Sequence, residues 1–311
     1  MGKNPFARLY KSFATSLIAW LLLISPAIAQ ITELSSDIRQ HLPLLTEDPA
    51  LVVELIQQSE QTNIPPIIQA QRAWLLSEAY FALSYPEKAM RQARLGLAAI
   101  NKQNQPWLYH RLVLSESSAF DLQGEPMKGL AGATEALNWA IQYQHKALQL
   151  DALFIRGMLL STLLEYTGAL QDLQQAYPLT PQIDSVVNKG NVANMIGQVY
   201  LHRGEPALSI PFFEKSIDYH RQHQQKLELS ISLYNLGKAQ KESQNLTAST
   251  QWLHESLQLA KQLQDIQGEA YALKELADVN IRHQQYALAK TQLNQAKEIF
   301  AQADNPFMQF E

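Results

Sequence analysis

A few polar residues stand at spacings that could support chemistry. His220 and His223 are three positions apart in a predicted helix, so their rings can share one face, and Asp218 lies close by. Two imidazoles and a carboxylate at this spacing could hold a zinc ion. The surrounding glutamines also fit a polar turn between two helices, which needs no metal. We therefore predict no metal ion and no other cofactor.

Other catalytic patterns are missing. The sequence has no G-x-S-x-G, H-E-x-x-H, Walker A or dinucleotide-binding motif. Gly237-Lys238 is followed by Ala239 and lacks the upstream glycine of a phosphate-binding loop. The absence of cysteine excludes a disulfide framework, a thiolate metal site and a cysteine nucleophile. We predict that the chain is not an enzyme.

Residues 1–29 are typical of a secretory signal sequence. Lys3, Arg8 and Lys11 make the start positive, residues 13–24 are mainly apolar, and residues 27–29 read Ala-Ile-Ala, a small-x-small cleavage pattern. The apolar run is short against the roughly 20 residues that a membrane span needs. We therefore expect cleavage, a periplasmic location and no membrane span in the mature chain.

The composition indicates a helical globular protein. The chain has 311 residues, of which 46% are hydrophobic and 17% charged, with only 12 glycines. Without residues 1–29 it keeps 22 Lys and Arg against 29 Asp and Glu, a net charge of −7. A moderately acidic protein is a poor ligand for polyanions, so we expect no nucleic-acid partner.

A period of 40 residues runs through most of the chain. A small residue recurs at this spacing inside helical apolar patterns: Ser77, Ser117, Gly157, Gly197, Gly237 and Ala277. Further small or apolar residues recur 12, 16 and 19 positions after each marker. The pattern predicts six units of two antiparallel helices, with a small marker residue where the second helix crosses the first.

Turn residues agree with this division. Gly124 and Gly204 suit the left-handed position that ends a helix, and Asn245 suits a helix N-cap. Three prolines lie nine residues after their markers, where the second helix should begin: Pro86, Pro126 and Pro206.

The spacing resembles the tetratricopeptide repeat (TPR), most clearly in the last three units. The fourth unit reads Ala193-x-x-Ile196-Gly197-x-x-Tyr200, and the fifth and sixth read Leu233-x-x-Leu236-Gly237 and Leu273-x-x-Leu276-Ala277. The resemblance implies an all-α, right-handed α-solenoid of six TPR-like helix pairs. We place this array at residues 66–303. Its 40-residue period exceeds the minimal 34 by six, which should lengthen the helices or the turns between units.

The segments flanking the array are expected to differ from it. Residues 30–65 are predicted to be an N-terminal helical cap, with one helix from Leu34 to Leu44 and a second that starts at Asp48-Pro49 and runs to about Glu60. The sixth unit's second helix is expected from about Tyr286 to Phe300. Residues 304–311 form a tail too short for another helix. Either the tail, a partner or a continuation of the chain would then cover the last unit.

The layout also resembles the periplasmic sensor half of bacterial signalling proteins that carry a tetratricopeptide array and a diguanylate cyclase or kinase domain. The sequence contains no Gly-Gly dipeptide, so the cyclase signature is missing. The resemblance therefore implies a sensory input module and no cyclase activity.

In the tetratricopeptide family, positions 2, 5, 9 and 12 of each first helix face a concave groove. This frame implies nine groove candidates: Trp74, Arg111, Asn191, Asn194, Gln198, Tyr234, Lys238, Lys241 and Lys274. Amides can bond to a peptide backbone and lysines can hold a carboxylate. An ordinary polar helix face explains the same residues without a ligand.

Our leading hypothesis from the sequence is a non-catalytic periplasmic module that binds a protein or peptide and serves as the sensory part of a signalling protein. The alternatives are an accessory scaffold for envelope assembly or secretion, and the front part of a cyclase or kinase whose catalytic domain is absent here.

Overall fold

The structure is a computed structural model that describes residues 34–59, 64–83, 85–182 and 187–302. The predicted signal sequence and the predicted tail at 304–311 lie outside the described residues. Within them the secondary structure is entirely helical, as predicted. No helix in the described ranges has both the length and the apolar character needed to span a bilayer.

The N-terminal segment holds three helices, α3 (Ser36–Arg39), α4 (Leu44–Glu47) and α5 (Pro49–Gln58). The expected helix from Leu34 to Leu44 is wrong, because two short turns of helix replace it. Pro43 disfavours helical backbone at the residue before it, so the first turn cannot run on into the second. The helix start at Asp48-Pro49 is confirmed, since the Asp48 carboxylate accepts a 2.9 Å hydrogen bond from the Leu51 N–H.

Twelve helices then form six consecutive pairs with the predicted period. First helices begin at 66, 106, 146, 189, 226 and 266, and second helices at 86, 126, 166, 206, 246 and 286. The pairs are α6 (Pro66–Ala82) and α7 (Pro86–Ala99), α8 (Pro106–Leu122) and α9 (Pro126–Gln142), α10 (Lys146–Thr162) and α11 (Tyr166–Ala176), α12 (Lys189–His202) and α13 (Pro206–Gln222), α14 (Lys226–Glu242) and α15 (Leu246–Leu263), α16 (Ile266–Arg282) and α17 (Tyr286–Gln302). Most helices have 17 residues, so the six extra residues per unit lengthen the helices rather than the turns.

Most turns between helices share one geometry, which repeats every 20 residues. A left-handed residue stands at each such turn: Gly124, Gln144, Leu164, Gly204, Gln224, Gln244, Gln264 and Gln284. The N–H of the next residue then bonds back to the carbonyl five positions earlier, as from Glu205 to Tyr200 and from Asp265 to Ala260, both at 2.9 Å. The prediction for Gly124 and Gly204 is confirmed.

The predicted helix starts are confirmed at Pro86, Pro126 and Pro206. The predicted cap at Asn245 is wrong. Asn245 precedes α15, but its side chain makes no cap bond and instead donates to the Gln240 Oε1 at 3.0 Å. The short polar side chain thus bonds back to the preceding helix α14.

The third unit departs from the regular pattern. Its second helix, α11, ends at Ala176 and continues as a 3₁₀ helix over Tyr177–Gln182. Pro178 and Pro181 lack N–H groups for α-helical bonds, which explains the early end. Asn188 then starts α12 with a reciprocal capping box, in which Asn188 and Asn191 bond to each other's backbone N–H.

All six marker residues are buried, as the repeat predicts. A methyl group added at Gly197 would lie 2.6 Å from the Phe213 ring, and one at Gly237 would lie 2.6 Å from Leu253. Each of these bulky residues stands 16 positions after its marker, on the second helix of the same unit. The glycines therefore let the paired helices cross at close range.

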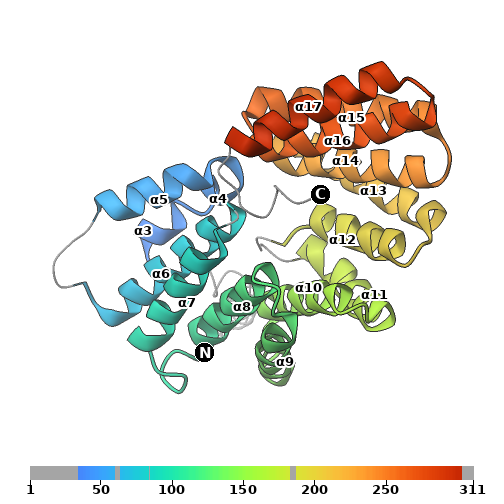
Figure 1. Cartoon of the computed structure of the whole chain (residues 1–311). Coiled ribbons are helices and arrows are strands. Elements are labelled where there is room, and N and C mark those ends of the chain that lie inside the picture. The colour runs from blue at the N-terminus through green and yellow to red at the C-terminus, as the bar shows by residue number, and fades with distance from the viewer. Residues whose placement is uncertain (1–33, 60–63, 84, 183–186, 303–311) are drawn as a thin grey trace, which may run out of the picture.

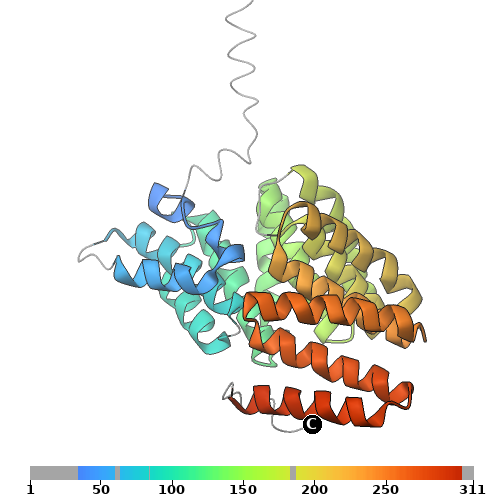
Figure 2. The same ribbon diagram turned by 90° about the horizontal axis from the view of Figure 1, so that it is seen from above.

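The six units follow one another along an arc (Figure 1), and the last two pairs stack at one end of it (Figure 2). First helices of successive units pack on one another, from α6 against α8 through to α14 against α16. Successive second helices are not among these packed pairs. The array therefore curves with its first helices on the inner side, and Figure 1 shows α9 and α11 outside α8 and α10.

An aromatic cluster that the sequence did not reveal fills the junction of α8, α9 and α10. His145 lies between Trp107 and Trp139, with ring centroids 6.2 and 5.7 Å away, and the fully buried His110 lies 5.0 Å from Trp139. His145 caps α10, because its Nδ1 accepts a 3.1 Å bond from the Leu148 N–H. Burial lowers the pKa of His110 and lowers that of His145 from 6.5 to about 4.

Gly197→Leu should lower the free energy of unfolding by about 3 kcal/mol, the upper end for overpacking, because Phe213 occupies the space that the new side chain needs. Urea titration measures the change. Gly168→Ala is the control, since its methyl group would lie 3.4 Å from Leu160, an ordinary contact, and it should not destabilise the protein. Equal stability of the Gly197 variant and the wild type would show that the helices do not need this close crossing.

His145→Asn should make stability less dependent on pH. The unfolded chain takes up a proton on His145 near pH 6.5, whereas the folded chain resists it until about pH 4. The free energy of unfolding contributed by this group therefore falls as the pH drops through that window. Asn keeps a helix cap but does not titrate. Thermal melts of the wild type, the variant and a control at the exposed His254→Asn, from pH 7 to 4.5, test this. A wild-type slope in the His145 variant would contradict it.

Candidate functional site

The inner face, formed by the first helices α6, α8, α10, α12, α14 and α16, carries all nine groove candidates. Their surroundings differ strongly along the array. In the first three units polar side chains bond to one another between units, whereas in the fourth and fifth units some remain uncommitted.

Trp74 and Arg111 belong to a buried network that joins the first three units. The Trp74 indole donates to Glu78 at 3.2 Å, and the Arg111 guanidinium stacks 5.1 Å from the Trp74 ring. Arg111 also forms an ion pair with Asp151 on α10, and the Ser115 hydroxyl donates to Glu78. Only 11% of the Arg111 side chain and 3% of the Asp151 side chain are exposed. These two candidates therefore hold units together.

Burial also affects the charge on Arg111. Removal from water lowers the pKa of its guanidinium, and the nearby Glu78 carboxylate acts in the opposite direction. Its compensating charges thus come from the unit before it and the unit after it.

The three amide candidates lie on α12 and are half-buried. Asn191 is occupied by the capping box with Asn188, and Asn194 accepts a 3.1 Å bond from Asn235 on α14. Gln198 makes no hydrogen bond to any residue that the structure describes. Of the three, Gln198 has an amide group available to a ligand.

The lysine candidates divide into two kinds. Lys241 is buried, and its Nζ reaches Glu275 at 2.6 Å, Asp278 and Glu242. Burial opposes its charge, but hydrogen bonds to Asp278 and Glu275 outweigh burial and raise the pKa of Lys241. The prediction that Lys241 could hold a partner's carboxylate is therefore corrected, because this chain's own carboxylates already occupy it.

Lys238 and Tyr234 form a different arrangement one turn away on α14. The Lys238 Nζ lies 5.4 Å from the centre of the Tyr234 ring, and no ion pair to Lys238 occurs among the described residues. The Tyr234 hydroxyl donates to Glu275 at 3.4 Å, and burial together with that carboxylate raises the pKa of Tyr234. Lys274, on α16, is exposed.

His202, at the end of α12, is a neighbour of Lys238 that sequence reasoning missed. Burial lowers the pKa of the His202 ring, and the positive charge of Lys238 lowers it further. A neutral imidazole beside an ammonium group and the Gln198 amide offers hydrogen bonds and one positive charge. Its place four residues after Gln198 on the same helix was the available signal.

The histidine pair first considered for a metal does not form a metal site. His220 is fully buried, with its Nδ1 2.8 Å from Gln225, while the His223 ring stacks 4.0 Å from the Tyr219 ring. The described part of the chain contains no group of three His, Asp or Glu residues placed to hold an ion. His220 thus packs inside the array rather than lying in a polar turn.

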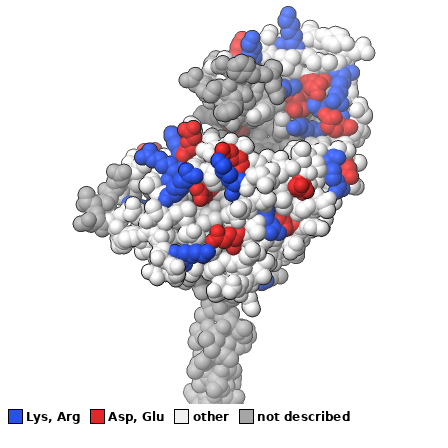
Figure 3. Space-filling view, turned by 60° about the horizontal axis from the view of Figure 1, so that its bottom comes forward, with Lys and Arg blue, Asp and Glu red and all other residues white. Residues whose placement is uncertain are grey.

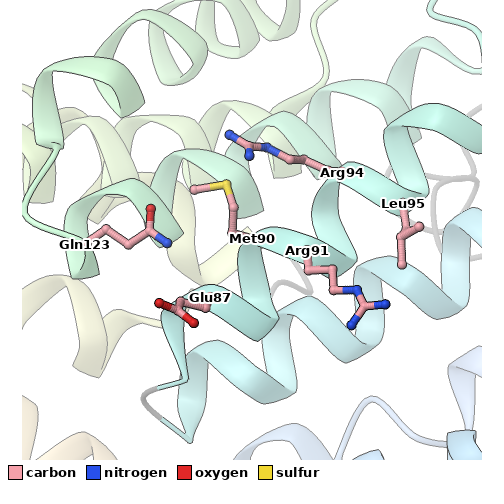
Figure 4. A pocket seen from close by; sticks show the side chains of 6 residues that line it. All are labelled: Glu87, Met90, Arg91, Arg94, Leu95 and Gln123. Carbon is pink, nitrogen blue, oxygen red and sulfur yellow. The ribbon is translucent and has the colours of Figure 1, made fainter.

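A pocket of about 430 Å³ lies along α7 on the first unit. Figure 4 shows its six lining side chains spread along α7 and the end of α8 rather than converging on one point. Arg94 is engaged by Glu116 at 2.7 Å, and Glu87 offsets the charge of Arg91. The surface in Figure 3 carries scattered charges of both signs and no broad field of one sign. Neither feature gathers groups for catalysis.

Asp151→Asn should destabilise the protein by about 3–5 kcal/mol, because it leaves the buried Arg111 charge without its main partner. Glu125→Gln, which breaks the exposed 2.7 Å pair with Lys128, is the matched control and should change little. Urea titrations of both variants provide the comparison. A small effect at Asp151 would mean that water reaches this network.

Neither a family model nor a curated protein matches the sequence. Several solved structures match the fold. A Rap protein complexed with competence and sporulation factor aligns over 86% of this chain and 78% of its own, with 12% identity and a TM-score of 0.64. NprR in complex with its cognate peptide NprX aligns over 85% and 77%, with 15% identity and a TM-score of 0.56.

A third match is a signal transduction ATPase of the STAND class from Pyrococcus horikoshii with a tetratricopeptide repeat sensor. It has 11% identity and a TM-score of 0.61, over 88% of this chain. This chain spans 44% of that protein and 46% of the matching Cut9–Hcn1 chain, so it corresponds to about half of each. At these identities the likeness concerns the fold. The chain therefore has the all-α solenoid fold of the tetratricopeptide-repeat proteins.

Proposed function

We propose that this chain is a non-catalytic module that binds a polypeptide segment on the inner face of its fourth and fifth units. The observation that carries the proposal is Lys238. It is half-buried on the inner face and stacked on Tyr234, with no carboxylate partner among the described residues. A buried or half-buried cation without a counter-charge is favourable where a ligand supplies one.

The neighbouring groups suit an extended peptide. Gln198 stands at the position equivalent to Lys238 on the preceding first helix and can bond to a peptide's backbone groups. Ile231, 42% exposed on α14, and the half-buried Phe154 and Met158 on α10 offer apolar contacts. The ligand we infer is thus a peptide with apolar side chains and a carboxylate, from an acidic residue or its C-terminus. Peptide complexes of two proteins with this fold support the same reading.

We further propose that binding is the input step of an exported signalling protein. The signal-like composition of residues 1–29 supports export. The tetratricopeptide sensor of the STAND ATPase supports a sensory use of this fold. The ion-paired and hydrogen-bonded state of the other inner-face groups supports binding without catalysis, because it leaves no acid and base free to act together.

Lys238→Glu should weaken peptide binding at least tenfold, since it replaces the attraction for a carboxylate by repulsion. Peptides selected from a display library on the wild-type protein, synthesised with free or amidated C-termini, provide the probes, and fluorescence anisotropy gives Kd. Lys215→Glu is the matched control, because Lys215 also lies over an aromatic ring, Phe212 at 5.1 Å, but on the second helix α13.

Unchanged helical content by circular dichroism establishes that both variants fold. Equal binding by the wild type and the Lys238 variant would refute the assignment of the site. Equal weakening by both variants would instead indicate a general effect of net charge.

A further inference from the structure

The outer side of α17 differs from the corresponding side of every other second helix. Tyr286, Lys290, Leu293 and Lys297 are spaced by four, three and four residues, so they form one stripe along the helix. In Figure 2, α17 is the outermost helix of the array, and no described helix lies beyond it. Tyr286 is 63% and Leu293 42% exposed, and both lysines are exposed.

The same stripe is a helix-binding surface in the two preceding units. On α15 it consists of residues 246, 250, 253 and 257, where Leu253 is fully buried against Leu276 and Val279 of α16. On α13 it consists of residues 206, 210, 213 and 217, where Phe213 and Ile217 pack against Leu233 of α14. The backbone of each unit therefore shapes this side of its second helix to receive a helix.

The α17 stripe keeps this shape but changes its chemistry. The position of Lys297 holds an apolar residue in all five earlier units: Leu97, Leu137, Tyr177, Ile217 and Leu257. Lys290 stands where α13 has Ile210 and α15 has Thr250. Neither lysine has a hydrogen bond or ion pair to a described residue. Glu298, the next residue, is turned by about 100° from Lys297 around the helix.

Electrostatics then selects the occupant. A fully apolar helix would bury two ammonium groups without counter-charges, which is unfavourable. A second copy of the same stripe would bring lysine against lysine, which disfavours that pairing. A helix with apolar residues toward Tyr286 and Leu293, flanked by carboxylates that reach Lys290 and Lys297, satisfies both parts of the stripe.

We propose that the outer side of α17 docks an acidic amphipathic helix of another polypeptide. The partner helix takes the place that the next unit's first helix takes against α13 and α15. This surface is separate from the inner face and independent of the peptide site at Lys238.

The test uses two synthetic 18-residue helical peptides with the same leucine stripe, one flanked by glutamates and one by lysines. Fluorescence anisotropy should show that the full chain binds the glutamate peptide and not the lysine peptide. Lys290→Glu with Lys297→Glu should weaken the glutamate peptide about tenfold or more and create binding of the lysine peptide. Leu293→Ala should weaken the glutamate peptide without changing this preference.

Lys215→Glu with Lys226→Glu is the control, because it changes the net charge equally on α13 and α14 and should leave binding unaltered. Lys238→Glu should also leave it unaltered, which separates this surface from the inner-face site. The proposal is overturned if neither peptide binds, or if the control pair weakens binding as much as the α17 pair. Self-association in sedimentation that Leu293→Ala abolishes would also overturn it, by assigning the stripe to a second copy.

Discussion

The close crossing of two helices within each unit is the constraint on which this architecture depends. In the third, fourth and fifth units a glycine on the first helix faces a bulky residue on the second, as Gly197 faces Phe213. In the first two units the marker is a serine and the facing residue an alanine, as in Ser77 and Ala93. The volume missing on one helix is thus matched by the other, which keeps the helices near enough to exclude water. Hydroxyl groups add a link across the crossing, since Ser77 donates to the Ala89 carbonyl and Ser249 to the Gly237 carbonyl.

Polar groups on the inner face act mainly between units. Arg111 and Asp151, Asn235 and Asn194, and Lys241 and Glu275 each join residues 34 to 41 positions apart, which is close to one unit. Such contacts satisfy groups that the curvature of the array would otherwise bury alone. They also reduce what the inner face can offer to a ligand, so the few uncommitted groups near Lys238 carry more significance than the number of polar residues there suggests.

The sequence predicted the regular parts well, because the repeat imposes the same local requirement many times. The helix starts at Pro86, Pro126 and Pro206 and the buried markers followed from residue type and spacing alone. The expected helix before Leu44 and the Asn245 cap failed, because each depended on one local competition that a neighbouring residue decided. The inner-face site was predicted only as a set of positions. Whether a lysine there is free, like Lys238, or neutralised, like Lys241, depends on carboxylates about 35 residues away in the next unit, and no local pattern reports that pairing.

The turns that recur every 20 residues have a consequence for how such a chain can change its length. Because most joints use the same three residues and the same backbone path, the ends of one unit are interchangeable with those of another. The size-matched crossing lies inside a unit, so a duplicated or deleted 40-residue cassette carries its own fitted core. Only the broken joint after Ala176, with its prolines and its separate capping box, is unlike the rest, and it therefore marks a fixed register in an otherwise modular ruler.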